Sequence, residues 1–208
     1  MQIVIGTNNR NKADEIISIL KSKFSNLFDI LSLSDFQQKI EIEETGETFA
    51  ENAELKSKQI FSVLKIPVIS DDSGLEVDIL NGAPGVISAR YAGKNASDQE
   101  NRKKLIQELS NFSGDSFSAK FQCVICYYDG SNLIKGTGFC SGRIILTERG
   151  TNGFGYDPLF IPDGYDQTFA ELPAEIKNKI SHRSNAFSDF LGNFQFFINQ
   201  KFEREKKY

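Results

Sequence analysis

Two adjacent carboxylates, Asp71 and Asp72, offer the clearest chemistry in this chain. A β-branched pair at 68–69 precedes them and a Ser-Gly pair at 73–74 follows, so the sequence predicts a strand that ends in an acidic turn. Ligands usually bind at strand ends in α/β sheets. Two carboxylates in one turn repel each other, and a bound cation or a shifted pKa on one of them usually relieves this. An ordinary acidic β-turn is the alternative.

A polar turn near the N-terminus offers a second kind of chemistry. It consists of Thr7, Asn8, Asn9, Arg10, Asn11 and Lys12. It joins a β-branched run at 2–5 to a segment at 13–24 with helical apolar spacing. Because helix N-termini present free N–H groups and a positive dipole end, we expect an anion site here, for phosphates. The glycines of a Walker A loop are missing, and a well-capped turn with solvated charges is the alternative.

A glycine-rich loop at 147–160 could recognise a base. Its candidate residues are Phe154, Gly155, Tyr156 and Asp157. The two rings can stack on a base, or they can simply fill the core. Farther along, His182 is the only histidine and stands beside Arg183 at the entrance to a predicted helix, where the pair suits polar recognition.

These residues need a scaffold of strands and helices to bring them together. We expect strands at 2–5, 30–33, 68–69, 117–128, 133–140 and 142–146, and helices at 13–24, 48–64, 98–109 and 185–197. Thr48 and Glu51 form a capping-box pattern at the start of the second helix, and Lys56 lies on its polar face. We see no repeat or clear linker and expect one domain over residues 1–208.

Composition excludes several classes of function. A net charge of −4 argues against a basic face for nucleic acid, although a local pocket can still bind a small anion. No apolar run approaches the roughly 20 residues that span a membrane. The N-terminus enters a strand directly and lacks a signal-peptide layout, so we expect a cytoplasmic protein.

The cysteines Cys123 and Cys126 have CxxC spacing, with Cys140 farther on. The pair lies in an apolar, aromatic run typical of a strand, whereas a redox CxxC normally opens a helix. A zinc site would also need more ligands than the distant histidine provides. We therefore expect buried, inert thiols.

Together, a phosphate-type turn, an acidic segment and an aromatic loop are typical of a magnesium-dependent enzyme that acts on a nucleoside triphosphate. Mg²⁺ prefers one or two carboxylates, substrate phosphates and several waters. Four stretches resemble the Ham1-like family of inosine triphosphate pyrophosphatases. They are TNNRNK at 7–12; EETG at 43–46 with ENAELK at 51–56; DDSGL at 71–75 with GAPG at 82–85 and SARY at 88–91; and GFGYDP at 153–158 with SHR at 181–183. They occur in the family's order and span nearly the whole chain.

The resemblance implies an α/β fold, in which a long mixed β-sheet is flanked by helices and forms two lobes with the active cleft between them. It also implies a cytoplasmic homodimer that hydrolyses ITP, dITP and XTP to the monophosphate and pyrophosphate.

The resemblance further implies roles for individual residues. Glu43 and Asp72 would hold Mg²⁺, and Asp72 would activate the attacking water, with Asp71 as the second choice. The turn at 7–12 would cradle the phosphates, with Lys12 as its point charge. A second charge near the leaving pyrophosphate would come from Lys56, and Ser73 could donate to a phosphate oxygen. Base recognition would fall to Phe154, Gly155, Tyr156, Asp157, Lys177, His182 and Arg183.

Three other interpretations stay open. A related pyrophosphatase for modified pyrimidine triphosphates would share the phosphate residues, but His182 and Arg183 favour a 6-oxopurine. A non-catalytic nucleotide-binding module would be expected to lack a carboxylate or a lysine among Glu43, Asp72, Lys12 and Lys56, yet all four are present. A redox or zinc protein built on the CxxC pair is the most distant alternative.

Overall fold

A computed structural model describes residues 1–7, 9–24, 27–37 and 40–205 of the chain, without the side chains of Asn11 and of residues 200–205. The described strands are β1 (Gln2–Ile5), β2 (Asp29–Ser32), β3 (Val68–Val77), β4 (Ser116–Tyr128), β5 (Leu133–Ile145) and β6 (Phe160–Pro162). The described helices are α1 (Arg10–Phe24), α2 (Phe49–Leu64), α3 (Asp98–Leu109), α4 (Ala174–Ile180) and α5 (His182–Glu205).

The strands of this described part form a six-stranded sheet in the order β2-β1-β3-β4-β5-β6. Strand β1 is parallel to both of its neighbours, β2 and β3, whereas β5 and β6 pair antiparallel. The sheet is therefore mixed, which confirms the predicted α/β class. No helix in the described ranges is long and apolar enough to span a membrane.

The chain divides into two compact units. Unit 1 comprises Met1–Asp72, Val124–Thr137 and Ala186–Tyr208, and unit 2 comprises Ser73–Cys123 and Gly138–Asn185. The chain passes from one unit to the other within β3, β4 and β5.

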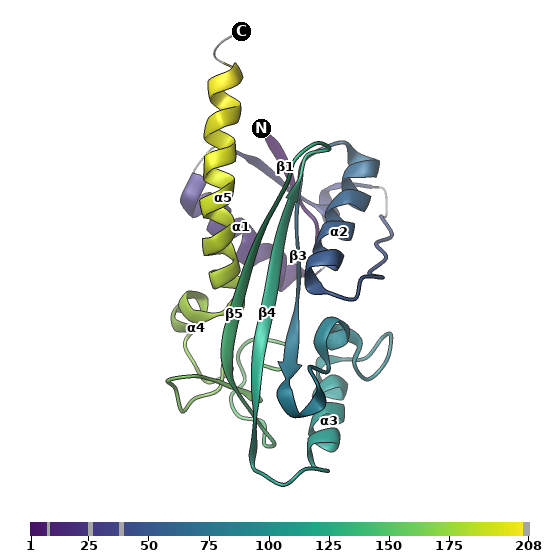
Figure 1. Cartoon of the computed structure of the whole chain (residues 1–208), viewed down its shortest axis with the longest axis vertical. Coiled ribbons are helices and arrows are strands. Elements are labelled where there is room, and N and C mark those ends of the chain that lie inside the picture. Colours follow the sequence, from purple (N-terminus) through teal and green to yellow (C-terminus); the bar gives the residue numbers. More distant parts are fainter. Residues whose placement is uncertain (8, 25–26, 38–39, 206–208) are drawn as a thin grey trace. The chain divides into compact units, whose positions relative to one another are not determined.

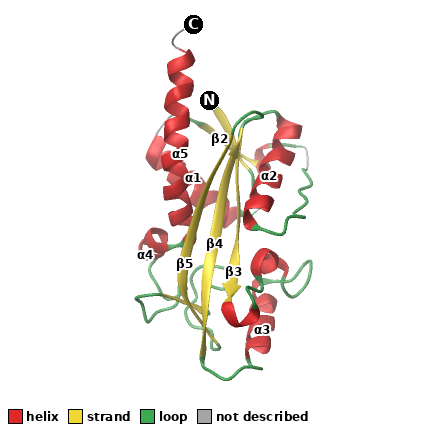
Figure 2. Ribbon diagram, in the orientation of Figure 1, coloured by secondary structure: helices red, strands yellow, loops and turns green. Residues whose placement is uncertain are grey.

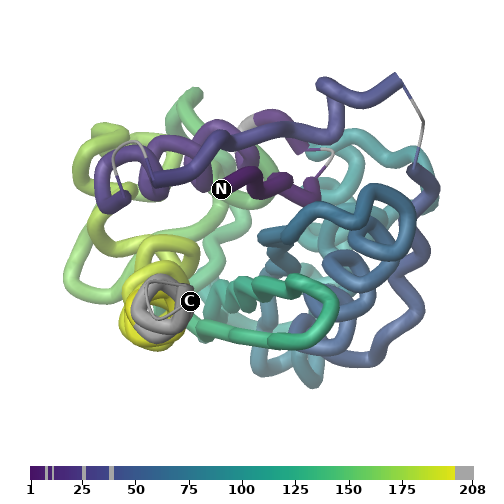
Figure 3. Tube along the Cα trace, turned by 90° about the horizontal axis from the view of Figure 1, so that it is seen from above, coloured from purple at the N-terminus to yellow at the C-terminus, as the bar shows by residue number. Residues whose placement is uncertain are grey.

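Unit 1 places helices on both faces of its strands (Figure 1). On one side α1 and α5 meet through Phe24 and Phe194, whose ring centroids are 5.7 Å apart. On the other side α2 packs through Ile60 against Val4 and Val68. A view along α5 shows the β4–β5 hairpin extending away from that helix (Figure 3), and Asp189 Oδ2 in α5 accepts a hydrogen bond from Thr137 N of β5 at 2.8 Å.

Unit 2 contains α3 and α4 together with long loops (Figure 2). Its core is rich in aromatic side chains, and Phe121 packs on both Phe160 and Phe169. The core also takes in Tyr156, a residue of the glycine-rich loop. That loop is consequently anchored to the core of this unit by one of its own rings.

The predicted acidic turn after residues 68–69 is wrong. Asp71 and Asp72 lie in the middle of β3, which continues without a break to Val77. The turn propensity of the Asp-Asp-Ser-Gly sequence does not decide the structure here. The strand is buried on both faces, and its two carboxylates lie on different faces. Successive side chains of a strand point to opposite faces, so Asp71 and Asp72 do not share one turn. Each carboxylate is also paired with a lysine, so its negative charge does not prevent burial of the strand.

Two further predictions need correction. The separate strands expected at 133–140 and 142–146 are one strand, β5, because pairing of Gly142 with Pro162 in β6 carries the ladder across the Ser-Gly step. The last helix begins at His182 instead of 185, and the segment before it forms the short helix α4. The predicted burial of the thiols is confirmed, since Cys123, Cys126 and Cys140 are free and buried.

Candidate functional site

The two central carboxylates each pair with a lysine from a different helix. Lys12, in the first turn of α1, places Nζ 3.0 Å from Asp71 Oδ2. Lys56, from the middle of α2, places Nζ 3.0 Å from Asp72 Oδ1. Because α1 and α2 lie on opposite sides of the strands, each helix serves the carboxylate that faces it (Figure 1). The sequence motif DD is therefore two ion pairs on two faces of one strand.

Lys56 also contacts a second carboxylate. Its Nζ donates to Glu44 Oε1 at 2.8 Å, so the ammonium lies between Glu44 and Asp72. The Lys56 side chain is 8% exposed and that of Asp72 is also 8% exposed. An ion pair this deeply buried costs desolvation energy and persists only when its geometry is well satisfied.

One face of α2 holds the acidic segment that carries Glu44. Asn52, Lys56 and Gln59 follow each other at helical spacing along this face. Asn52 Oδ1 accepts from Gly46 N at 2.8 Å, and the Gln59 amide bonds both the N–H and the C=O of Glu43, at 2.9 and 3.0 Å. These contacts fix the register of the segment and turn the Glu44 side chain toward Lys56.

Burial and charge act in opposite directions on this group. Burial raises the pKa of Asp72 above its ordinary value, and Lys56 and Lys12 oppose that change without cancelling it. Burial by itself would lower the pKa of Lys56, but the charges of Asp72, Asp71 and Glu44 outweigh it and raise the pKa. Lys56 therefore stays an ammonium at any physiological pH, while Asp72 accepts a proton more readily than an exposed carboxylate.

The same group fits a hard divalent cation. Asp72 Oδ2 is buried and has no hydrogen-bond partner in the described part of the chain. Glu43 keeps its backbone on Gln59 while its side chain is exposed. Among the described residues, no cluster of three or more His, Cys, Asp or Glu side chains forms a protein-only metal site. A cation with one or two carboxylate ligands and substrate oxygens for the rest is the type of site that these residues allow.

The N-terminal turn is organised around Asn9. Its side-chain oxygen accepts from Lys12 N at 3.2 Å, so Asn9 caps α1, and its own N–H donates to Thr7 Oγ1 at 3.2 Å. Arg10 is exposed at the helix start. The predicted site residue Asn8 lies outside the described residues, and Asn11 is described only as part of the α1 backbone.

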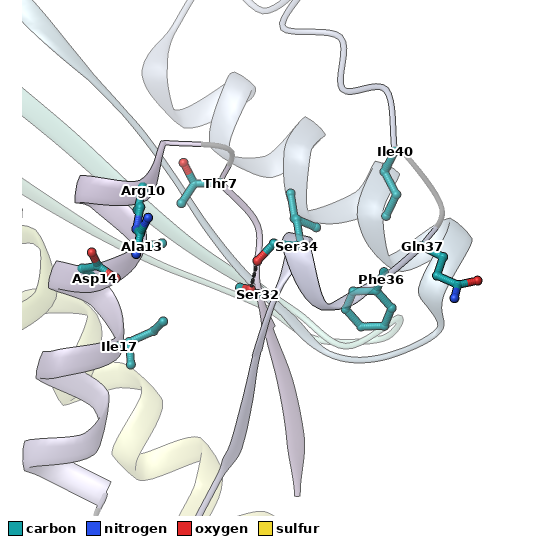
Figure 4. A pocket seen from close by; sticks show the side chains of 11 residues that line it. Thr7, Arg10, Ala13, Asp14, Ile17, Ser32, Ser34, Phe36, Gln37 and Ile40 are labelled. Atoms are coloured by element: carbon teal, nitrogen blue, oxygen red, sulfur yellow. Dashed lines mark hydrogen bonds between the residues drawn. The ribbon is translucent and has the colours of Figure 1, made fainter.

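A pocket of about 800 Å³ adjoins this turn in unit 1 (Figure 4). Thr7, Arg10 and Asp14 line it from the turn and α1, and Ser34 and Phe36 line it from the segment after β2. The Ser34 hydroxyl is 2.6 Å from that of Ser32, as the dashed line in Figure 4 marks. The pocket thus lies between the start of α1 and the segment that follows β2.

In unit 2 the base-recognition candidates form a second connected group. Asp157 Oδ2 accepts from Lys177 Nζ at 2.5 Å and from Phe154 N at 2.8 Å. Lys177 Nζ lies 5.0 Å and Arg183 Cζ lies 5.8 Å from the centre of the Phe154 ring. Arg183 also donates to Ser73 Oγ at 3.3 Å. Burial raises the pKa of Asp157, with Lys177 opposing the change.

Three other base-recognition candidates, His182, Tyr156 and Gly155, contact residues outside the Asp157–Lys177 pair. The His182 ring stacks on Phe121 with its centroid 4.7 Å away and the planes 14° apart. Tyr156 OH donates to Ser88 O at 2.8 Å, so this ring is a structural anchor and not an exposed stacking face. The backbone N–H and C=O of Gly155 form hydrogen bonds with Asp98 and Arg102 of α3.

Sequence reasoning missed the part played by Glu44, Asn52 and Gln59. Glu43 and Glu44 are adjacent and chemically equal, so no local pattern indicates which one turns toward Lys56. The helical spacing of Asn52, Lys56 and Gln59 was the available signal, because three polar residues on one face of a half-buried helix need partners.

Known proteins resemble this chain over most of its length. Residues 3–193 match the profile of the Ham1 family. The chain is 48% identical over 189 residues to a dITP/XTP pyrophosphatase of Listeria monocytogenes, with 89% of this chain and 90% of that protein covered. It is 46% identical over 189 residues to a dITP/XTP pyrophosphatase of Oceanobacillus iheyensis, with 89% and 93% covered.

Solved structures agree with this assignment. The Ham1 protein of Staphylococcus aureus superposes with a TM-score of 0.81 at 40% identity, with 97% of this chain and 100% of that chain covered. A HAM1 protein from Coxiella burnetii gives a TM-score of 0.82 at 35% identity, with 96% and 99% covered. The sequence, the connected polar groups and the fold lead to the same conclusion: this chain belongs to the Ham1 family.

Proposed function

We propose that this chain hydrolyses the purine nucleoside triphosphates ITP, dITP and XTP to the monophosphate and pyrophosphate, and so removes them from the nucleotide pool. The names of its relatives support this substrate class. The observation that carries the chemistry is the buried Lys56 ammonium held between Asp72 and Glu44. Buried cations and carboxylates at fixed positions are what a reaction on a polyanion requires.

We assign phosphate binding mainly to residues of unit 1, with Ser73 of unit 2 as the exception. The turn at 7–12 cradles the phosphates through side chains and the N–H groups at the start of α1, with Lys12 as a point charge. Lys56 adds a second charge near the leaving pyrophosphate. Glu43 and Asp72 would hold Mg²⁺, which supplies charge neutralisation at the phosphates when bound.

The attacking water falls to Asp72. Water must approach the α-phosphorus in line with the bond to the β-phosphate, and a carboxylate with a raised pKa is a better base than an exposed one. Asp71 is the weaker candidate because its side chain is fully buried on the other face of β3, whereas that of Asp72 is 8% exposed. Ser73, the next residue along the strand, donates to a phosphate oxygen.

The base falls to unit 2. Phe154 offers a ring for stacking, with Gly155, Tyr156 and Asp157 shaping the loop around it. Lys177 joins the base-recognition group, and His182 and Arg183 supply donors that match the oxo group at C6 of hypoxanthine and xanthine. Adenine carries an amino donor there, so its binding would leave buried donors unpaired at about 1–3 kcal/mol each. This corresponds to roughly tenfold or more in discrimination per contact.

The remaining expectations belong to the same proposal. The chain acts as a single domain over residues 1–208, as a cytoplasmic homodimer. Its partner is a small nucleotide and neither nucleic acid nor a membrane, in keeping with its net charge of −4.

A substrate panel tests the proposal. Purified protein with Mg²⁺ is given XTP, dITP, ATP and dUTP, and products are resolved by ion-exchange chromatography. We expect pyrophosphate and monophosphate from XTP and dITP and little from ATP. Faster turnover of dUTP than of XTP would replace the purine assignment by a pyrimidine one. Release of inorganic phosphate in place of pyrophosphate would contradict cleavage at the α-phosphorus.

A further inference from the structure

Two side chains of α3 form hydrogen bonds with the loop that carries Phe154. Asp98 and Arg102 lie one turn apart on α3, so both face the same neighbour. Asp98 Oδ2 accepts a hydrogen bond from Gly155 N at 2.7 Å, and Arg102 donates through its guanidinium to Gly155 O at 2.8 Å. Both polar groups of a single residue, on either side of its Cα, are thus held by two charged side chains.

Arg102 also ties down the start of the same loop. Its Nε lies 3.0 Å from Glu148 Oε1, and the Arg102 side chain is only 14% exposed. The contact with Glu148 is an ion pair, because Arg102 Nε has no hydrogen-bond partner in the described part of the chain, while another nitrogen of the same planar guanidinium donates to Gly155 O. Glu148 and Gly155 are therefore connected through a rigid side chain that spans the loop.

The hydrogen bonds with Asp98 and Arg102 hold a residue whose backbone is in the left-handed region. Gly155 has a positive φ of 60° and stands directly between Phe154 and Tyr156. The Phe154 side is braced from inside by Asp157, and the Tyr156 side by Ser88. Without the α3 contacts, the intervening peptide groups would exchange protein partners for water, and the ring of Phe154 would lose its fixed orientation.

We propose that Asp98 and Arg102 are positioning residues for nucleobase binding: they act through Gly155 to hold the Phe154 ring and do not contact the nucleotide themselves. The inference rests on the proposed function, in which Phe154 stacks on the base. It predicts an effect on substrate binding and on discrimination between XTP and ATP, and little effect on the chemical step, whose residues belong to unit 1.

The first readout is independent of catalysis. Exchange of the Gly155 amide is followed by NMR in wild type, Asp98→Ala, Asp98→Asn and the control Lys103→Ala, an exposed position on the same helix. We expect faster exchange in Asp98→Ala only, because Asn keeps an oxygen acceptor for the N–H. Unchanged exchange in Asp98→Ala would overturn the positioning role of Asp98, and stability in urea shows that each variant is folded.

The second readout is kinetic. Asp98→Ala and Arg102→Ala should raise KM for XTP by about two- to tenfold, the range for loss of one hydrogen bond, with kcat changed less than about twofold. The ratio of kcat/KM for XTP over ATP should fall, Asp98→Asn should stay near wild type, and Lys103→Ala should match wild type. A looser loop with unchanged KM would overturn the positioning role.

Failure of the proposed function gives a different result. Wild-type protein that hydrolyses none of the nucleotides would refute the pyrophosphatase assignment, while XTP affinity measured by calorimetry would still test the positioning role. Equal XTP affinity in wild type and Arg102→Ala would then overturn it.

Discussion

Lys56 is the buried cation that two carboxylates of unit 1 share. It contacts Glu44 and Asp72 directly, and the charge of Asp71 contributes to its raised pKa. Removal of this cation would leave buried carboxylates that repel each other. In the proposed mechanism, stability and catalysis therefore depend on the same ammonium group.

Replacement of Lys56 by Met should reduce the free energy of unfolding by about 3 kcal/mol or more, since loss of one partner leaves a buried charge uncompensated. The matched control is Lys58→Met, two residues farther along α2 and on the opposite side of the helix. Lys58 is 47% exposed and pairs with Glu54 near the surface, so its loss should cost less than about 1 kcal/mol. Urea denaturation measures both. Equal losses would contradict the account of Lys56.

The thiols provide a second test at the scale of residues. Burial raises the pKa of Cys126 to about 11 and that of Cys140 to about 12, so neither is a thiolate at neutral pH. Native protein at pH 7.5 should incorporate almost no iodoacetamide, whereas protein in urea should take up a label at each cysteine. Rapid labelling of Cys123 or Cys126 in the native state would revive the redox interpretation.

At the scale of elements, the sequence predicted most helices because their signals are local. Thr48 caps α2 and bonds Glu51 as the capping box requires. The fate of Asp71 and Asp72 was not local, because sheet pairing and lysines from two helices decide it. The choice between Glu43 and Glu44 was equally hidden, since it depends on a register that α2 imposes across the chain.

The glycine-rich loop allows a matched pair of substitutions. Gly153 and Gly155 both have positive φ, 77° and 60°, so alanine at either should cost about 1–2 kcal/mol for the left-handed backbone. A Cβ at Gly155 meets nothing within 4 Å, but one at Gly153 would lie 2.0 Å from Asp157 Oδ2. Gly153→Ala should therefore destabilise more in thermal unfolding and also raise KM for XTP. Identical behaviour of the two variants would contradict the described position of Asp157.

At the scale of the whole molecule, the chain divides into two units, yet β3, β4 and β5 each contribute residues to both. Unfolding of one unit would strip three strands of half their length. We therefore expect the whole chain to unfold in one cooperative transition in calorimetry, with equal calorimetric and van't Hoff enthalpies. Two separated transitions would contradict a single domain over residues 1–208.

The proposed roles of the two units are compatible with the acidic composition of the chain. A net charge of −4 conceals a local concentration of cations in each unit, at Lys12 and Lys56 in one and at Lys177 and Arg183 in the other. An acidic protein can in this way present local cationic groups to a polyanionic nucleotide.

The most direct test of the account is pyrophosphate release from XTP with Mg²⁺ by wild type, Asp72→Asn and the exposed control Asp78→Asn. Asparagine keeps the shape of Asp72 but removes its charge and basicity. The account predicts that kcat falls by about 10²-fold or more in Asp72→Asn, the usual contribution of a general base, and is unchanged in Asp78→Asn. A fully active Asp72→Asn enzyme would contradict the account and move the base role away from Asp72.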